Sequence, residues 1–177
     1  MSLRITQSNS NDTSPETIRS LVNLINEVYA SVEGDMWKPD NSGRTYDAEV
    51  EKFVKNGEIF IARIDDEIVG SVRIEHIDDQ TLAFGMLVAD PDRRSEGIGR
   101  ELVATCENHA RENGYTNMQL ELLTPRHWEN PSKEFLKEWY GRIGYIPTKS
   151  RPFEEISPHR MDEFATECDF TVWIKEL

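Results

Sequence analysis

The chain is poor in cysteine and has no long apolar run. Its 177 residues include two cysteines, Cys106 and Cys168, which lie far apart and without the spacing of a metal site or a redox pair. No run approaches the roughly 20 apolar residues that a membrane-spanning helix needs. The polar first residues also lack the apolar segment of a secretory signal. These absences predict a soluble, cytoplasmic protein with reduced thiols, no metal site and no membrane partner.

Positive charge is also scarce. Lysine and arginine number 20 against 33 aspartate and glutamate residues, which gives a net charge of -13. A protein that follows the phosphates of a nucleic acid needs a positive field. We therefore expect no nucleic-acid partner. An acidic surface favours solubility, and it would also attract a cationic substrate.

What the sequence does contain is typical of an ordinary globular protein. Hydrophobic residues make up 37% and charged residues 30%, so residues 1–177 are predicted to form a single domain with its own core. Hydrophobic periodicity and turn residues predict strands and helices in mixed order, an α/β (α+β) class. The predicted strands are 3–7, 58–64, 67–77, 81–88, 117–123, 144–147 and 168–177. The predicted helices are 14–29, 47–55, 98–113 and 132–143, with irregular segments at 30–46 and 149–167.

One turn between a strand and a helix, 88-VADPDRRSEGIGREL-102, carries the features of an anion site. The first N–H groups of a helix lack carbonyl partners, and the helix dipole adds partial positive charge there. Gly97 and Gly99 leave the backbone open to a ligand, and Arg94 and Arg100 supply charged donors for phosphate. The alternative is that these glycines only ease a tight turn. No Gly-Lys-Ser/Thr and no three-glycine fingerprint occurs here, which excludes the two common nucleotide loops.

This turn resembles a known signature. The run from Pro91 to Gly99 matches P-x-x-[RQ]-x-x-G-x-[GA] of the GNAT superfamily of acyl-CoA-dependent N-acyltransferases, and Leu87 and Ala89 match the apolar residues before its proline. A second motif, 140-YGRIGYIP-147, resembles the family's Y-x-x-[LI]-G-[FY] through four residues: Tyr140, Ile143, Gly144 and Tyr145. The resemblance covers roughly residues 58–147. It implies a mixed, mostly antiparallel sheet of six to seven strands flanked by about four helices.

The resemblance also implies acetyl-CoA as cosubstrate. In that fold the strand before the turn splays from the strand after the helix, and the pantetheine arm enters the gap. The residues implied to hold this arm are Leu87, Val88 and Ala89. Those implied to hold the pyrophosphate are Arg94, Ser95, Glu96, Gly97, Ile98, Gly99 and Arg100. Relatives commonly add an asparagine seven residues before the motif tyrosine; this chain has Lys133 there, and Asn130 is the nearest asparagine.

The reaction implied is direct attack of an amine on the thioester while both substrates are bound. An ammonium must lose a proton before it attacks, and the departing thiolate is stabilised by gaining one. Tyr140 occupies the family's position for the general acid; the alternative is an aromatic that only packs beneath its helix.

The general base is less directly indicated. Many relatives carry a glutamate on the strand before the phosphate turn, but residues 81–88 contain no titratable side chain. Glu121 ranks first, because the strand around it resembles one that supplies a base in some members and its apolar neighbours would point the other way. Glu75 and His76 rank second, and a proton path through water remains open.

The acceptor is expected between the segments 30–46 and 149–167. Tyr29 and Trp37 would contact it through their aromatic faces, and four carboxylates nearby in sequence would favour a cationic amine: Glu33, Asp35, Glu154 and Glu155. The leading hypothesis is an N-acetyltransferase acting on a primary amine of a small or amino-acid-like molecule. A protein N-terminus or lysine is a rival acceptor, and a non-catalytic acyl-CoA sensor is a rival function. The resemblance leaves a homodimer open.

Overall fold

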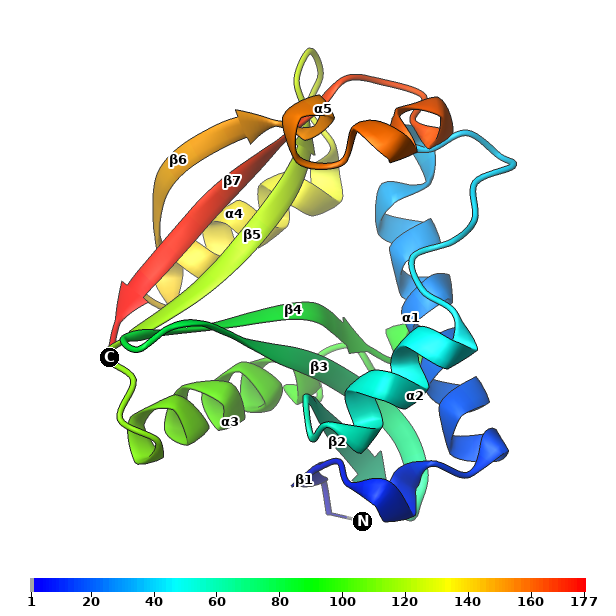
Figure 1. The fold of residues 1–177 in the computed structure, drawn as a ribbon, viewed down its shortest axis with the longest axis vertical. Coiled ribbons are helices and arrows are strands. Elements are labelled where there is room, and N and C mark those ends of the chain that lie inside the picture. The colour runs from blue at the N-terminus through cyan, green and yellow to red at the C-terminus, as the bar shows by residue number, and fades with distance from the viewer. Residues whose placement is uncertain (1) are drawn as a thin grey trace.

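The computed structural model describes residues 2–177 and contains one seven-stranded sheet in the order β1-β2-β3-β4-β5-β7-β6 (Figure 1). The strands are β1 (Arg4–Gln7), β2 (Ile59–Ile64), β3 (Glu67–Asp78), β4 (Thr81–Ala89), β5 (Asn117–Pro125), β6 (Ile146–Pro152) and β7 (Cys168–Glu176). Within the described chain β4 and β5 pair in parallel, and the other neighbours pair antiparallel. The predicted mixed, mostly antiparallel sheet is therefore confirmed.

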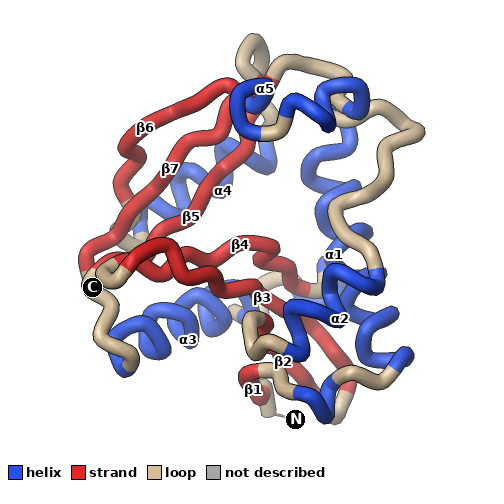
Figure 2. The backbone as a smooth tube through the Cα atoms, in the orientation of Figure 1, coloured by secondary structure: helices blue, strands red, loops and turns tan. Residues whose placement is uncertain are grey.

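Helices cover both faces of this sheet (Figure 2). They are α1 (Pro15–Glu33), α2 (Asp47–Lys55), α3 (Ile98–Glu112), α4 (Pro131–Arg142) and the short α5 (Phe153–Ile156). Residues 59–62 of β2 are all apolar, as expected for a stretch that is buried on both faces. Ile59 and Ile61 pack in the core formed with α1 and α2, whereas Phe60 and Ala62 pack in the core formed with α3 and α4.

Local sequence signals set several element ends as expected. Ser14 caps α1 by accepting a hydrogen bond from the Thr17 N–H at 3.2 Å, and Pro15 occupies the first turn. The hairpin between β2 and β3 turns at Asp65 and Asp66, whose φ angles of 50° and 68° are typical of the two-residue turns that join twisted strands.

The segment 149–167, predicted to be irregular, is more regular than expected. Strand β6 continues to Pro152, α5 follows, and a 3-10 helix spans Pro158–Glu163. The prediction was wrong because β6 is an edge strand: its backbone pairs with β7, while most of its side chains are exposed. Exposed side chains need no apolar alternation, so the sequence carries no strand pattern there.

Strand β4 is irregular beside Gly85, and a glycine within a strand often marks a bulge. Its register against β3 shifts between Ser71 and Arg73, and the residue in the left-handed region is Met86, with φ of 50°. A non-glycine residue in this region is strained. The Met86 side chain is 4% exposed and packs in the core with α1 and α2, so its burial offsets that strain.

Two further predictions concern the cysteine thiols and membrane-spanning helices. Cys106 and Cys168 are both buried and unbonded, and burial raises the pKa of the Cys168 thiol to about 12. In the described residues, no helix combines the length and the apolar character needed to cross a bilayer.

Candidate active site

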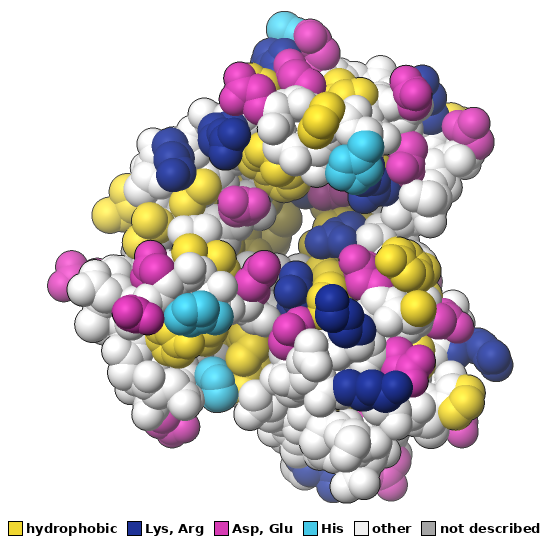
Figure 3. Space-filling view, viewed as in Figure 1, with side chains coloured by type: hydrophobic (Ala, Val, Ile, Leu, Met, Phe, Trp, Pro, Cys, Tyr) yellow, Lys and Arg dark blue, Asp and Glu magenta, His cyan; other side chains and the backbone are white. Residues whose placement is uncertain are grey.

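The sheet opens at its centre because β4 and β5 separate. They pair only from Thr81 to Ala83, opposite Asn117 to Gln119, and then diverge. A cavity of about 680 Å³ lies in the gap. Its walls come from residues 83–89 of β4, residues 119–123 of β5, and parts of α1, the segment 34–46, β3, α4, the segment 153–160 and β7. The hollow is visible at the centre of Figure 3.

The edge of β4 that faces β5 is unpaired along this gap. Among residues 2–177, no strand pairs with that edge beyond Ala83. The three residues predicted to hold the pantetheine arm, Leu87, Val88 and Ala89, all line the cavity. A strand edge of this kind presents free N–H and C=O groups to any extended, amide-containing chain.

The turn after β4 has the predicted open backbone. Gly97 caps α3 with φ of 77°, and Ser95 also lies in the left-handed region with φ of 74°. A Cβ atom at Gly97 would meet no atom within 4 Å, so glycine is needed for its dihedral angle rather than for space. In the described chain, no backbone carbonyl accepts from the N–H groups of residues 97–100. These groups point out of the start of α3 as an anion site requires.

The arginines of this turn differ in their pairing. Arg93 is bonded to Glu67 at 3.1 Å and lies 3.6 Å from Glu96. The side chain of Arg100 is 77% exposed, and its one carboxylate neighbour in the described chain is Glu101, at 3.8 Å. Arg94 is exposed and has no ion pair within residues 2–177. Arg94 and Arg100, the predicted phosphate ligands, are therefore the available cations.

Tyr140 lies on α4 and lines the cavity although it is 5% exposed. Its ring packs against Trp139, Phe84 and Tyr145, with centroids 5.0, 6.1 and 6.0 Å away. Burial raises the pKa of the phenol above its ordinary value. The hydroxyl makes no hydrogen bond within the described residues, whereas that of Tyr145 donates to Glu107 at 2.9 Å. Tyr140 is thus a protonated donor at neutral pH, with its hydroxyl uncommitted.

Glu121 lies on β5 across the gap and lines the same cavity. Its neighbours Leu120 and Leu122 are buried in the opposite core, so the carboxyl faces the gap as predicted. Partial burial raises the pKa of Glu121, and the nearby charge of Glu75 adds to the rise. A carboxylate with a raised pKa is a better proton acceptor for an ammonium.

Glu75 and His76, ranked second as general base, are placed differently from Glu121. Glu75 lines the cavity but pairs with Arg73 at 3.4 Å. His76 lies outside the lining, with its Nδ1 3.0 Å from the hydroxyl of Tyr115. The geometry therefore favours Glu121 over both.

Asn130 caps the N-terminus of α4. Its Oδ1 accepts from the N–H groups of Ser132 and Lys133 at 3.0 and 3.2 Å, and its Nδ2 donates to the Val32 carbonyl at 2.9 Å. The helix accordingly begins at Pro131 rather than at Ser132. Asn130 is absent from the cavity lining, so its amide holds α4 against α1, and the cofactor contact stays a prediction.

Lys133 forms a buried ion pair that the sequence does not indicate. Its Nζ donates to Glu33 Oε1 at 2.5 Å, and each side chain is 5% exposed. The indole N–H of Trp37 donates to the other Glu33 oxygen at 2.9 Å. All three residues line the cavity. This cluster ties α1 to α4 across the gap.

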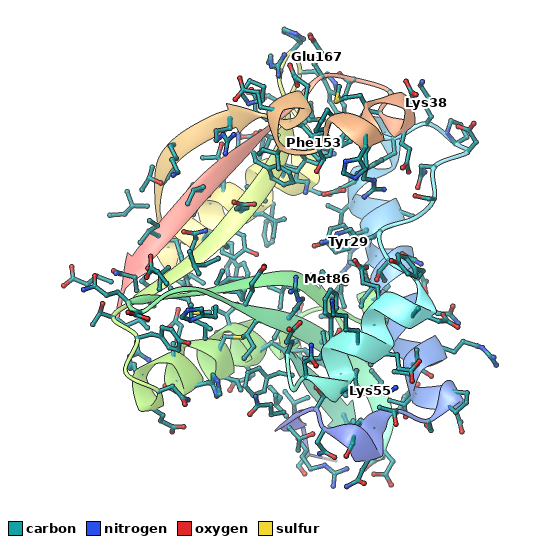
Figure 4. The ribbon with its side chains drawn as sticks, in the orientation of Figure 1. Tyr29, Lys38, Lys55, Met86, Phe153 and Glu167 are labelled. Atoms are coloured by element: carbon teal, nitrogen blue, oxygen red, sulfur yellow. The ribbon has the colours of Figure 1, made fainter. Side chains whose placement is uncertain are left out.

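The predicted acceptor residues, Tyr29 and Trp37, line the cavity opposite β5. Figure 4 shows Tyr29 on α1 close to Met86 of β4. Burial raises the pKa of Tyr29. The Trp37 ring contacts Phe164 at a centroid distance of 4.0 Å and carries Arg160 at 4.7 Å, so its faces are largely occupied by the protein.

The acidic surroundings predicted for the acceptor are not found at the cavity. Of the four carboxylates, only Glu33 lines it, and Lys133 neutralises that charge. Glu154 pairs with Arg126 at 3.1 Å, and Glu155 lies 3.8 Å from Arg151. Sequence reasoning also missed the four cationic lining residues, Arg44, Arg73, Lys133 and Arg160. Arg44 and Arg160 lie in segments predicted to be irregular, where nothing in the sequence signals which side chains face inward.

Glu163 fastens the segment 34–46 to the 3-10 helix beside the cavity. It accepts from the N–H and hydroxyl of Ser42, at 2.9 and 2.8 Å, and from Arg160 Nε at 3.2 Å. The hydrogen bond from Arg160, with those from Ser42, lowers the pKa of Glu163 from 4.5 to about 2.

Glu163 should therefore contribute stability that depends on acid pH. The folded state binds fewer protons than the unfolded state between pH 4.5 and 2, so this contribution is present above pH 4.5 and is lost as the pH falls toward 2. We expect Tm to fall more steeply between pH 5 and pH 3 in the wild type than in Glu163→Gln, measured by thermal melts. Glu155→Gln, an exposed carboxylate on the same segment, should keep the wild-type slope. Parallel slopes for all three proteins would contradict the assignment.

Comparison with known proteins agrees with this geometry. The family model described as "Acetyltransferase (GNAT) family" matches residues 19–141. A search of curated proteins found no relative by sequence.

Solved structures share the fold at low identity. An aminoglycoside 6'-N-acetyltransferase complexed with coenzyme A has a TM-score of 0.71 at 19% identity, over 98% of this chain and 96% of that one. A GNAT family acetyltransferase from Elizabethkingia anophelis with acetyl-CoA bound has a TM-score of 0.61 at 16% identity, over 99% and 98%. The N-acetylglutamate synthase from Neisseria gonorrhoeae, complexed with coenzyme A and N-acetyl-glutamate, has a TM-score of 0.63 at 17% identity, over 100% of this chain and 35% of that one. The present chain thus spans about a third of that synthase.

Proposed function

The chain belongs to the acetyltransferase (GNAT) family, and from that premise we propose that it transfers an acetyl group from acetyl-CoA to the primary amine of a small, amino-acid-like acceptor. The observation that carries the proposal is the convergence at one cavity of an unpaired strand edge, a protonated tyrosine and a carboxyl group. The first suits an extended amide chain, and the other two suit the proton transfers of aminolysis.

The residues present fit coenzyme A as a bound group. The free edge of β4 at Leu87, Val88 and Ala89 would pair with the amides of the pantetheine arm. The unpaired N–H groups at the start of α3 would bind the pyrophosphate. Arg94 and Arg100 would add charge-assisted hydrogen bonds. The bound thioester supplies the acyl group, with a carbonyl open to attack.

Two side chains would carry out the proton transfers as general base and general acid. Glu121 accepts a proton from the acceptor's ammonium, directly or through water, which frees the nitrogen lone pair. A C–N bond forms as the C–S bond breaks, and Tyr140 donates its phenolic proton to the departing sulfur. The nitrogen loses two protons in all: the first passes from Glu121 to solvent, and the second, lost as the amide forms, re-protonates Tyr140, so protons balance over one turnover. Because burial raises the pKa of Tyr140, the phenol is re-protonated readily at neutral pH.

The direct test is a panel of amines incubated with acetyl-CoA, with thiol release measured and acetylated products identified by mass. Acetylation of at least one small amine is the expected result. Acetylation of peptide N-termini or lysines alone would favour the rival acceptor class. Tight binding of coenzyme A without turnover on any amine would overturn the enzymatic proposal in favour of a sensor.

The phosphate-binding assignment predicts a separate effect at Gly97. Because its φ is 77°, Gly97→Val forces strain on the turn and places a side chain among the N–H groups. We expect the Kd for coenzyme A to rise at least about tenfold, the loss of one to two hydrogen bonds to a charged group. Calorimetric titration measures it.

Gly114→Val is the matched control. Gly114 ends the same helix with φ of 83° and equally open surroundings, so it carries the same strain away from the turn. A similar loss of Tm in both variants, with weaker coenzyme A binding only in Gly97→Val, is expected. Equal affinities in the two variants would refute a role for the turn.

A further inference from the structure

The charge of the cavity is unlike that of the protein surface. Seven charged side chains line the cavity: Glu33, Glu75, Glu121, Arg44, Arg73, Lys133 and Arg160. Cations thus outnumber carboxylates there, in a chain whose net charge is -13. Figure 3 shows Lys and Arg side chains beside the hollow, on the side of α1 and α2. Such a lining does not suit an acceptor that is purely cationic.

Most of these charges neutralise one another or a neighbour. Lys133 pairs with Glu33 at 2.5 Å. Arg73 pairs with Glu58 at 3.1 Å and with Glu75 at 3.4 Å.

The two remaining cations of the lining, Arg160 and Arg44, differ in whether they form an ion pair. Arg160 pairs with Glu163 at 3.1 Å. Within residues 2–177, Arg44 has no carboxylate within ion-pair distance, and Glu121 has no cation. One positive and one negative group in the same cavity therefore have no ion-pair partner among the described residues.

The backbone at Arg44 is held in place. Asn26 Oδ1 accepts from the N–H groups of Arg44 and Thr45 at 2.9 and 3.0 Å, and Asn26 Nδ2 donates to the Thr45 carbonyl at 3.0 Å. Gly43 precedes it in the left-handed region, with φ of 84°. Arg160 also donates to the Gly43 carbonyl at 3.3 Å. Arg44 thus projects from a fixed turn rather than from a free loop.

The Arg44 guanidinium lies over the ring of Tyr29, 5.2 Å from its centroid. A side-chain hydrogen bond also links Arg44 to Tyr29, and it uses one of the five N–H donors of the guanidinium. The remaining N–H groups include paired donors in the geometry that a carboxylate accepts. Arg44 is partly buried, so an anion bound there is less screened than on the open surface.

We propose that the acceptor is a zwitterion, an amino acid or close analogue whose carboxylate is bound by Arg44 while its ammonium faces Glu121. This inference rests on the proposed acetyl transfer and names its substrate class. One such ligand would give both groups an ion-pair partner. It also presents its amine to the base.

The test compares amino acids with their amides. The series runs from an α-amino acid to one with five carbons between amine and carboxylate, since the structure leaves that spacing open. kcat/KM is measured for each acid and its amide with the wild type and with Arg44→Gln, Arg44→Lys and Arg73→Gln. Amine reactivity differs between an acid and its amide, but it cancels when the acid-to-amide ratio is compared between proteins.

We expect the wild type to prefer at least one acid over its amide, and Arg44→Gln to reduce that ratio by about 10- to 100-fold, as for hydrogen bonds to a charged group. Arg44→Lys should keep part of the preference, because it retains the charge but not the paired donors. Arg73→Gln removes a cation from the same lining that is already paired, so it should keep more of the preference than Arg44→Gln. An acid-to-amide ratio that Arg44→Gln leaves intact would overturn the inference while acetyl transfer stands.

A binding experiment distinguishes a failure of this inference from a failure of the proposed acetyl transfer. N-acetyl amino acids carry the carboxylate without the amine, and they can be titrated calorimetrically into the protein with coenzyme A present. Binding that exceeds that of the N-acetyl amides and is lost in Arg44→Gln supports the carboxylate site even if no amine is acetylated. Equal binding of both compound types, together with no turnover, overturns both proposals.

Discussion

Replacing Tyr140 with phenylalanine is expected to lower kcat by about 10²- to 10⁴-fold, the usual contribution of a positioned general acid, with little change in coenzyme A affinity. The ring packs against Phe84, Trp139 and Tyr145, and phenylalanine keeps those contacts. The hydroxyl has no partner in the described residues, so its removal leaves no buried group unsatisfied. Steady-state kinetics and calorimetric binding measure the two quantities.

Tyr145→Phe is the matched control for this experiment. It removes the same hydroxyl from a neighbouring buried ring, but that hydroxyl donates to Glu107. We therefore expect a loss of stability of about 1 kcal/mol, the net value of a hydrogen bond, with kcat near the wild-type value. If Tyr140→Phe and Tyr145→Phe have equal kcat values, Tyr140 only packs beneath its helix.

Replacing Lys133 with methionine is expected to lower the free energy of unfolding by about 3–5 kcal/mol, because it leaves the buried Glu33 carboxylate uncompensated. Both members of the pair are 5% exposed. Trp37 would remain the one hydrogen-bond partner of Glu33 among residues 2–177. Urea denaturation followed by fluorescence measures the change.

The double variant Glu33→Gln/Lys133→Met tests the cause of that loss. Glutamine removes the charge and keeps an acceptor for the Trp37 indole, so much of the lost stability should return. Lys137→Met is the matched surface control on the same helix. Its pair with Glu134 is 39% exposed on both sides, and the expected loss is at most about 1 kcal/mol. A double variant no more stable than Lys133→Met alone would show that the packing of the lysine, not its charge, matters.

The two sides of the proposed site differ in how they are built. The proposed cofactor side comes from contiguous chain: the end of β4, which lines the cavity, and the turn into α3, which follows it in sequence. The proposed acceptor side is assembled from α1, the segment 34–46 and the segment 153–160. Glu163 and Arg160 hold the last two together. Stability of this side and acceptor recognition are therefore expected to be linked.

The sequence by itself determined the features that depend on local chemistry. Ser14 caps α1, Gly97 takes the left-handed angle at the start of α3, and the apolar run of β2 is buried on both faces. Each follows from neighbouring residues, because backbone dihedrals, caps and periodicity are short-range properties. For the same reason the two contiguous motifs identified the fold and the family.

Only the tertiary structure decided which charges remain uncompensated. Glu33 and Lys133 are 100 positions apart in the chain and meet in a buried pair, so the carboxylate expected to attract a cationic amine is neutralised. Arg44 lies in a segment without periodicity, and Glu121 lies on a strand beyond α3. Pairing between charges is set by distances in space, which sequence spacing does not determine across separate elements. The nature of the acceptor therefore depends on how α1, α4 and the two irregular segments close around the gap between β4 and β5.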